Sequence, residues 1–198
     1  MGRTRLTRLA AVACIVAWSF GASARESSSG PLTFDLRDSA DRRHTEKEWS
    51  GARAIVLFFI TPDCPVSQGY VPEMNRIRAD FAARGILVYG VQSDLAAADT
   101  EVRRHVEEFA YAFPVLLDRR HELVEHVDAE ITPEAVVLTP SGEVLYQGRI
   151  DDRIPAIGVR RPRATRHELR DALDAVLSGG TVARTGPPAV GCFIVRRT

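Results

Sequence analysis

A residue whose side chain could carry redox chemistry, Cys64, closely follows a short apolar segment, and the hydroxyl residues Thr61 and Ser67 lie three positions before and after it. That segment, residues 54–60, reads A-I-V-L-F-F-I; it is too short for an ordinary helix and predicts a buried strand. Because a helical pattern begins at once after it, we expect Cys64 at the first turn of a helix. There the unpaired backbone N–H groups and the positive end of the helix dipole stabilise a thiolate, the nucleophilic form of cysteine. Thr61 or Ser67 could hydrogen-bond that thiolate.

A second cysteine, Cys192, lies near the C-terminus, after an irregular segment rich in glycine and proline at residues 179–190. One interpretation is a resolving cysteine that folds back onto Cys64, since a tail of about fifteen residues spans up to roughly 50 Å when extended. The glycines would let this tail swing. The other interpretation is a surface thiol or a link between two molecules. The sequence leaves both open, because the redox potential of the pair decides its role.

The first 24 residues have the pattern of a secretory signal peptide. A basic start precedes an apolar run at residues 9–20, and A-S-A follows and ends at Ala24. The apolar run is short for a membrane span, so we expect cleavage rather than stable membrane insertion. The mature chain would then be exported to the periplasm or the extracellular space.

Cleavage would change both the charge and the cysteine content. It removes three arginines and no acids from a chain with 26 basic and 26 acidic residues, so no basic surplus indicates nucleic-acid binding. It also removes Cys14 and leaves Cys64 and Cys192. An even cysteine count in an oxidising compartment favours a disulfide or a redox pair.

The elements that must position Cys64 follow from hydrophobic periodicity and turn signals. We expect a flexible lead-in at residues 25–31, one domain at 32–178 and a C-terminal tail at 179–198. Within the domain, helices are predicted at residues 66–83, about 99–110, 121–127 and 165–177; strands are predicted at 54–60, 86–91, 114–117, 135–139 and 144–147. Strands that alternate with helices before a final hairpin and helix favour an α/β fold, with a mixed central sheet covered on both faces. Pro72 lies inside the first helix and predicts a kink.

Two stretches of the chain resemble the thioredoxin-fold redoxins. They are F-F-I-T-P-D-C-P-V-S around Cys64, and T-P-E-A-V-V-L with P-S-G-E-V-L-Y-Q-G-R-I-D within residues 131–151. The nearest groups are the extracytoplasmic thioredoxin-like oxidoreductases and the alkyl hydroperoxide reductase/thiol-specific antioxidant branch. The resemblance covers roughly residues 32–177 and implies a thioredoxin-like fold with a redox-active Cys64.

The resemblance also implies a substrate-binding wall at Thr132 and Pro133, joined by a cis peptide bond beside the active cysteine. Because proline has no N–H, strand pairing halts there. We expect this to leave the Ile131 carbonyl and the Thr132 backbone groups free to pair with an extended substrate peptide.

The chain departs from both branches. A dithiol thioredoxin has Cys-x-x-Cys, whereas here Ser67 stands in place of the second cysteine. Asp63 replaces the tryptophan that usually precedes the first cysteine. The Asp63 carboxylate would raise the pKa of Cys64 unless it points to solvent. A peroxiredoxin has Pro-x-x-x-Thr-x-x-Cys, in which Thr61 matches but Leu57 replaces the proline. Peroxiredoxins also have an arginine near the position where this chain has Thr132-Pro133. Arg149 and Arg119 are the candidates to take its place in the folded protein.

These features predict an exported thiol-disulfide oxidoreductase, with Cys64 as nucleophile and Cys192 as resolving cysteine. Its substrate would be a protein or small-molecule disulfide, and its thiol electron donor is unknown. The first alternative is a thiol peroxidase acting on peroxide, and the second is a non-enzymatic binding or metal-handling module. The five histidines are scattered, so no metal site or cofactor is predicted. The arginine-rich loop at residues 151–164 is either a solvated face or a docking surface for a partner or an anionic substrate.

Overall fold

A computed structural model describes residues 32–196, so the predicted signal peptide at 1–24 and lead-in at 25–31 lie outside the described residues. Within residues 32–196, no helix is long and apolar enough to cross a membrane. The helices are η1 (Glu46–Trp49), α1 (Pro65–Ala82), α2 (Asp99–Glu108), α3 (Glu122–Val127) and α4 (Glu168–Leu177). The strands are β1 (Asp35–Arg37), β2 (Arg43–Thr45), β3 (Ala54–Ile60), β4 (Ile86–Gln92), β5 (Val115–Leu117), β6 (Ile131–Thr132), β7 (Glu134–Leu138), β8 (Val144–Gly148) and β9 (Cys192–Phe193).

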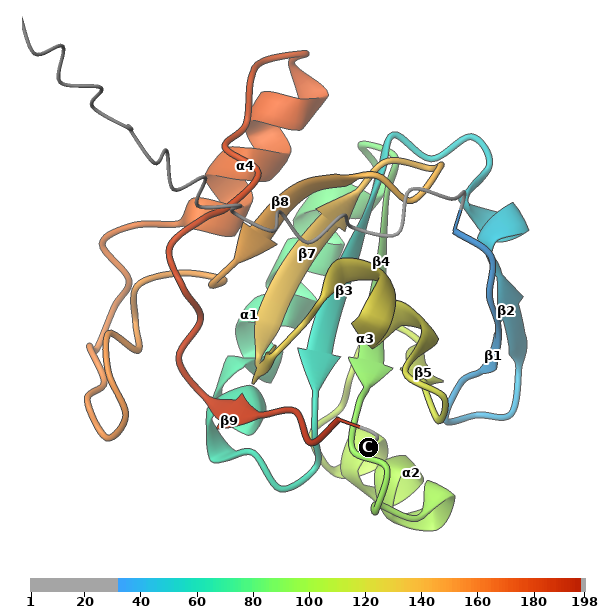
Figure 1. Cartoon of the computed structure of the whole chain (residues 1–198). Helices are drawn as coiled ribbons and strands as arrows, with labels where there is room; N and C mark the ends of the chain where they lie inside the picture. Colours follow the sequence, from blue (N-terminus) through green and yellow to red (C-terminus); the bar gives the residue numbers. More distant parts are fainter. Residues whose placement is uncertain (1–31, 197–198) are drawn as a thin grey trace, which may run out of the picture.

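Five strands form the central sheet, in the order β5-β4-β3-β7-β8. β3 pairs in parallel with β4, and β4 with β5, whereas β7 runs antiparallel to both β3 and β8. Helices α1 and α4 pack on one face of this sheet, and α3 and η1 pack on the other (Figure 1). The arrangement confirms the predicted mixed sheet covered on both faces by helices.

The central strand β3 explains why the two faces each have a core. Its side chains alternate between the faces, as a pleated strand requires. Val56, Phe58 and Ile60 pack toward α1 and α4, and the residues between them pack toward α3 and η1. Every residue of β3 is buried, which accounts for the uninterrupted apolar run in the sequence.

Helix boundaries differ from the predictions where side chains find other partners. α4 begins at Glu168 rather than at Thr165. The Thr165 backbone N–H donates to the buried Asp152 carboxylate at 2.7 Å, so this threonine anchors the preceding loop instead of capping the helix. α2 begins at Asp99 after the residue Ala98, without a side-chain cap. α1 runs through Pro72 as one helix.

The C-terminal tail, residues 179–196, is bound to the domain rather than free. It runs from α4 past β8 to β9 (Figure 1), which lies beside β6. The Gln147 backbone N–H donates to the Arg184 carbonyl at 2.8 Å, and the Arg149 N–H donates to the Pro187 carbonyl at 3.0 Å. Beyond these bonds β9 pairs antiparallel with β6, and Ile194 is buried in the core on the α3 side.

Candidate functional site

Cys64 lies where β3 ends and α1 begins, as predicted. It is the N-cap residue of α1, in an extended conformation, and Pro65 follows at the first helical position, where its missing N–H costs no hydrogen bond. The Cys64 carbonyl accepts the first helical bond from the Gln68 N–H at 3.0 Å. The side chain of Cys64 is fully buried, so a partner reaches its sulfur only if the covering residues move.

Two polar residues contact or face the Cys64 sulfur. The Cys64 thiol donates to the Thr132 carbonyl oxygen at 3.1 Å, and the Thr132–Pro133 peptide bond is cis, as the resemblance implied. The Ser67 hydroxyl is buried and has no other hydrogen-bond partner within residues 32–196. It is therefore available to donate to the Cys64 thiolate, and it lowers the pKa of Cys64.

The second cysteine lies directly across from this site. In the β6–β9 pair, Cys192 is opposite Thr132, and the Thr132 hydroxyl donates to the Cys192 carbonyl at 3.4 Å. Gly191 makes this approach sterically feasible, because a Cβ at that position would overlap the Thr132 carbonyl oxygen. Both cysteines are free in this structure. The Thr132 backbone groups that were expected to await a substrate peptide are thus already paired with the tail of the same chain.

The two thiols have opposite pKa shifts. Burial acts to raise the pKa of Cys64, but hydrogen bonds from Cys192, Ser67 and Thr132 outweigh it, and the net pKa is lowered. For Cys192, burial together with the hydrogen bond to Cys64 and its charge raises the pKa to about 11. The first proton to leave the pair therefore comes from Cys64, and Cys192 stays a thiol that stabilises the Cys64 thiolate.

We expect alkylation of the reduced protein by iodoacetamide to show two separate pH profiles. The rate at Cys64 should have its inflection below about 8.5, the value of free cysteine, whereas the rate at Cys192 should still be rising at that pH. Peptide mass spectrometry after timed quenching measures both rates. A Cys64 inflection at or above the free-cysteine value would remove the argument for a stabilised thiolate.

The other residues singled out in the sequence take different positions. The Thr61 hydroxyl pairs with the Thr132 hydroxyl at 3.3 Å, so it contacts the site through Thr132 rather than through the sulfur. Asp63 is exposed, and the pKa of Cys64 is lowered in its presence. Arg149 is bound to Glu168, and Arg119 is bound to Asp99. Within residues 32–196, neither arginine has a hydrogen bond to Cys64 or Thr132.

Sequence reasoning did not anticipate the pairing of β9 with β6. The signal was present as V-G-C-F-I-V at residues 190–195, a short run of β-branched and aromatic residues around a glycine. Along it Cys192 is half-buried, Phe193 exposed, Ile194 buried and Val195 exposed, which is the alternation of a strand at the protein surface.

Comparisons with known proteins address the family and the fold. A sequence model of the AhpC/TSA family matches residues 31–147. The curated thiol-disulfide oxidoreductase ResA of Halalkalibacterium halodurans is 19% identical over 147 residues, which cover 71% of this chain and 82% of that protein. The family match ends before the arginine-rich loop, α4 and the tail that carries Cys192.

Solved structures resemble the fold over a longer part of the chain. A hypothetical protein from Sinorhizobium meliloti has a TM-score of 0.72 at 27% identity and covers 83% of this chain and 91% of its own. A secreted disulfide oxidoreductase from Mycobacterium tuberculosis has a TM-score of 0.51 at 17% identity, and the match covers 75% of this chain and 96% of that one. The fold is thioredoxin-like, and with the match of its sequence over residues 31–147 the chain belongs to the AhpC/TSA family.

Proposed function

We propose that the protein is an exported thiol-disulfide oxidoreductase with Cys64 as nucleophile and Cys192 as resolving cysteine. The observation that carries this proposal is the β6–β9 pair, which puts Cys192 opposite the residue whose carbonyl accepts the Cys64 thiol. The relatives named as oxidoreductases, one of them secreted, support the same chemistry and an extracytoplasmic location. Thr132 and Pro133 form the wall of the site, and Ser67 stabilises the thiolate.

The reaction has two displacement steps. The Cys64 thiolate attacks one sulfur of a substrate disulfide; that S–S bond breaks, a Cys64–substrate disulfide forms, and the departing thiolate takes up a proton. The Cys192 thiolate then attacks the Cys64 sulfur and releases the second substrate thiolate. The substrate gains two electrons, and the protein is left with a Cys64–Cys192 disulfide, which a thiol donor reduces. Run in reverse, the same steps oxidise a substrate dithiol.

The pKa shifts give these steps an order. While Cys64 is a thiolate, burial of Cys192 and the hydrogen bond and charge of Cys64 together raise the pKa of Cys192, so Cys192 does not compete as a nucleophile. Formation of the mixed disulfide removes that charge. Both contributions from Cys64 then disappear, and Cys192 loses its proton more readily at the moment when it is needed.

A thiol peroxidase is the second candidate, and membership of the AhpC/TSA family is the observation that favours it. In that reaction the Cys64 thiolate would attack a peroxide oxygen, break the O–O bond and release the other oxygen as water or an alcohol, leaving Cys64 as a sulfenic acid. Cys192 would then condense with this sulfenic acid, forming the Cys64–Cys192 disulfide and releasing water. We rank it second because peroxide cleavage needs donors that stabilise the charge developing on oxygen. Arg149 and Arg119 are instead bound to carboxylates.

The pairing of the two cysteines is tested by equilibrating the mature chain in mixtures of reduced and oxidised dithiothreitol. Free thiols are then blocked, and the protein is digested without reduction. We expect one intramolecular link between Cys64 and Cys192 that appears and disappears reversibly with the redox ratio. Cys192 found only in links between molecules, or Cys64 free at every ratio, would overturn the assignment.

A further inference from the structure

A cavity of about 430 Å³ lies between α1 and the arginine-rich loop at residues 151–164, beside Cys192. Its lining is mostly apolar and includes Pro65, the residue after the nucleophile. From α1 come Val66, Gly69 and Tyr70, and from the loop come Ile154, Ile157 and Val159. The cavity is therefore lined by Cys192 and by the residue next to Cys64, and it has the composition of a site for an apolar side chain.

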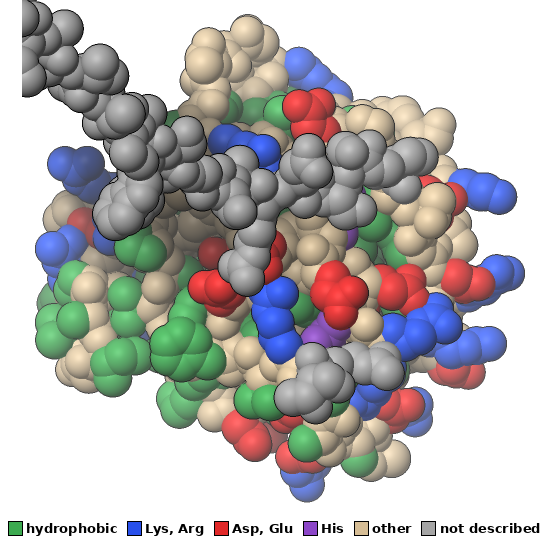
Figure 2. Space-filling view, in the orientation of Figure 1, with side chains coloured by type: hydrophobic (Ala, Val, Ile, Leu, Met, Phe, Trp, Pro, Cys, Tyr) green, Lys and Arg blue, Asp and Glu red, His purple; other side chains and the backbone are tan. Residues whose placement is uncertain are grey.

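The surface around this cavity is also apolar. Four large hydrophobic side chains are exposed within residues 32–196, and all of them lie in the loop or the tail: Ile157, Val159, Phe193 and Val195. Figure 2 shows hydrophobic side chains gathered on the side of the molecule where the loop and β9 lie. Exposed apolar groups that cluster at one place mark an interaction site rather than a random surface.

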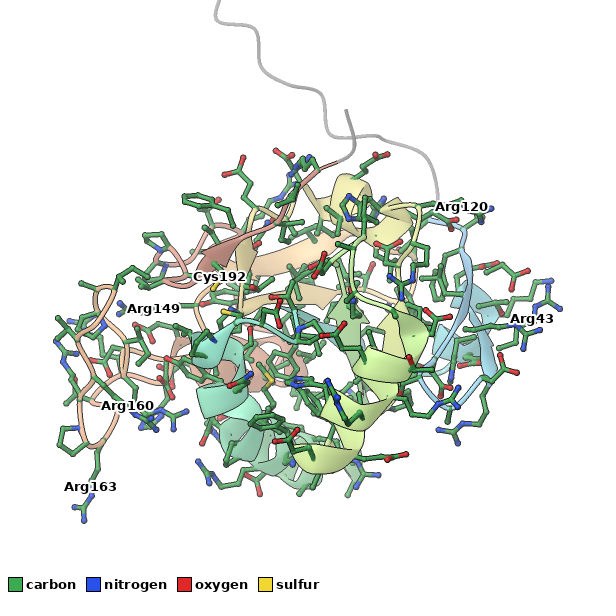
Figure 3. The ribbon with its side chains drawn as sticks, turned by 90° about the horizontal axis from the view of Figure 1, so that it is seen from below. Arg43, Arg120, Arg149, Arg160, Arg163 and Cys192 are labelled. Atoms are coloured by element: carbon green, nitrogen blue, oxygen red, sulfur yellow. The ribbon has the colours of Figure 1, made fainter. Side chains whose placement is uncertain are left out.

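The charges of the loop add a second feature. Arg153 and Arg161 are bound to the buried carboxylates Asp151 and Asp152. Arg160 has no carboxylate partner in the described part of the chain, and it reaches over α1, with Nη1 3.7 Å from the Cβ position of Gly69. In Figure 3, Arg160 turns toward α1, whereas Arg163 points outward at the tip of the loop. The cavity therefore has an unneutralised cation at its rim.

The loop is held in place before any partner binds. The Tyr70 hydroxyl donates to Asp151 at 2.8 Å, and the Arg153 guanidinium lies 4.7 Å from the centre of the Tyr70 ring. Asp152 accepts the backbone N–H groups of Thr165 and Arg166. A preformed cavity orders few groups on binding and so loses little affinity to entropy.

We propose that this cavity docks a segment of the substrate protein in which an aliphatic side chain stands next to an aspartate or glutamate, close to the disulfide. The aliphatic group fills the cavity, and the carboxylate pairs with Arg160. This inference rests on the proposed function, and it names the class of protein disulfide that Cys64 would attack. A docked segment would position its disulfide at the cysteine pair and raise the rate of exchange by proximity.

The test measures binding without redox chemistry. Three short fluorescein-labelled peptides differ at two adjacent residues, which are leucine–aspartate, leucine–lysine or serine–aspartate. In all three, serine replaces the cysteine that would form the disulfide. Fluorescence anisotropy gives their Kd values with wild type, Gly69→Leu, Arg160→Glu and Arg163→Glu. Gly69→Leu fills the cavity from a helical position where leucine is favoured over glycine. Arg163→Glu makes the same charge change as Arg160→Glu, but outside the cavity.

Of the three peptides, we expect the leucine–aspartate peptide to bind wild type most tightly. Its affinity should fall roughly tenfold or more with Gly69→Leu, since loss of a buried anchor residue typically has an effect of this size. Arg160→Glu should bind the leucine–lysine peptide more tightly than the leucine–aspartate peptide, whereas Arg163→Glu should keep the wild-type preference for aspartate. Equal affinities for the three peptides, or no effect of Gly69→Leu, would overturn the proposal. So would tighter binding of a fatty-acid anion that displaces every peptide. Exchange of the wild-type protein with 2-hydroxyethyl disulfide, which is too small to need the cavity, tests the proposed function separately.

Discussion

Replacement of Cys192 by serine is expected to stop turnover at a mixed disulfide between Cys64 and the substrate. Attack by Cys64 does not require a sulfur at position 192, but release of the second substrate thiol does. The variant should therefore consume one equivalent of a protein disulfide and accumulate a covalent adduct. Non-reducing electrophoresis and intact-mass measurement detect this adduct. Continued turnover at the wild-type rate, without an adduct, would show that Cys192 is not the resolving cysteine.

A second variant tests whether the Cys192→Ser protein stops because it lacks a second thiol near Cys64. Ser67 is buried and lies three residues after Cys64, where the Cys-x-x-Cys motif of thioredoxin has its second cysteine. It contributes a hydrogen bond to the thiolate. Ser67→Cys in the Cys192→Ser background restores a nearby thiol with little change in volume. We expect the adduct to be released again, because the new cysteine can attack the Cys64 sulfur.

Replacement of Gly191 by alanine is expected to slow resolution while leaving the sulfur of Cys192 in the protein. The added methyl group would overlap the Thr132 carbonyl oxygen and lie 3.2 Å from Pro133, so β9 would have to leave β6. The thiol would then be held only by a tether, and the lost positioning should slow the second step by roughly tenfold or more. Rapid-quench sampling of the mixed disulfide measures that step.

Gly180→Ala is the control for this change, because it adds the same methyl group to the same tail. Its nearest neighbour would be the Ala175 carbonyl oxygen at 3.4 Å, close to an ordinary contact. Resolution in Gly180→Ala should match wild type. Equal rates in Gly191→Ala and wild type would show that the strand pairing of the tail does not position Cys192.

The parts of this protein that could be predicted from the sequence depend on local pattern. The apolar run at residues 54–60, followed at once by helical periodicity, is enough to place Cys64 at the start of a helix. The cis bond before Pro133 came from family resemblance, and the structure has it. For Cys64 the determining residues are neighbours in the chain, so no long-range contact had to be known.

The parts that could not be predicted depend on contacts between distant segments. The glycines of the tail indicated freedom to swing, yet Gly191 is the residue that allows close packing against Thr132. A glycine has the same appearance in a sequence whether it serves flexibility or close approach. Similarly, the sequence pattern predicts that α4 begins at Thr165, but the buried Asp152 carboxylate, thirteen residues earlier, binds this threonine and the helix begins at Glu168.

The most direct test of the central claim compares two reactions of reduced Cys64 in one preparation. Stopped-flow measurement gives the second-order rate constants with a peptide disulfide and with hydrogen peroxide, and Cys64→Ser provides the blank. We predict faster reaction with the disulfide, abolished in Cys64→Ser, and a reaction with peroxide close to that of a free cysteine thiolate. Peroxide consumption orders of magnitude faster than by a free thiolate, and faster than disulfide exchange, would contradict the account and identify a thiol peroxidase.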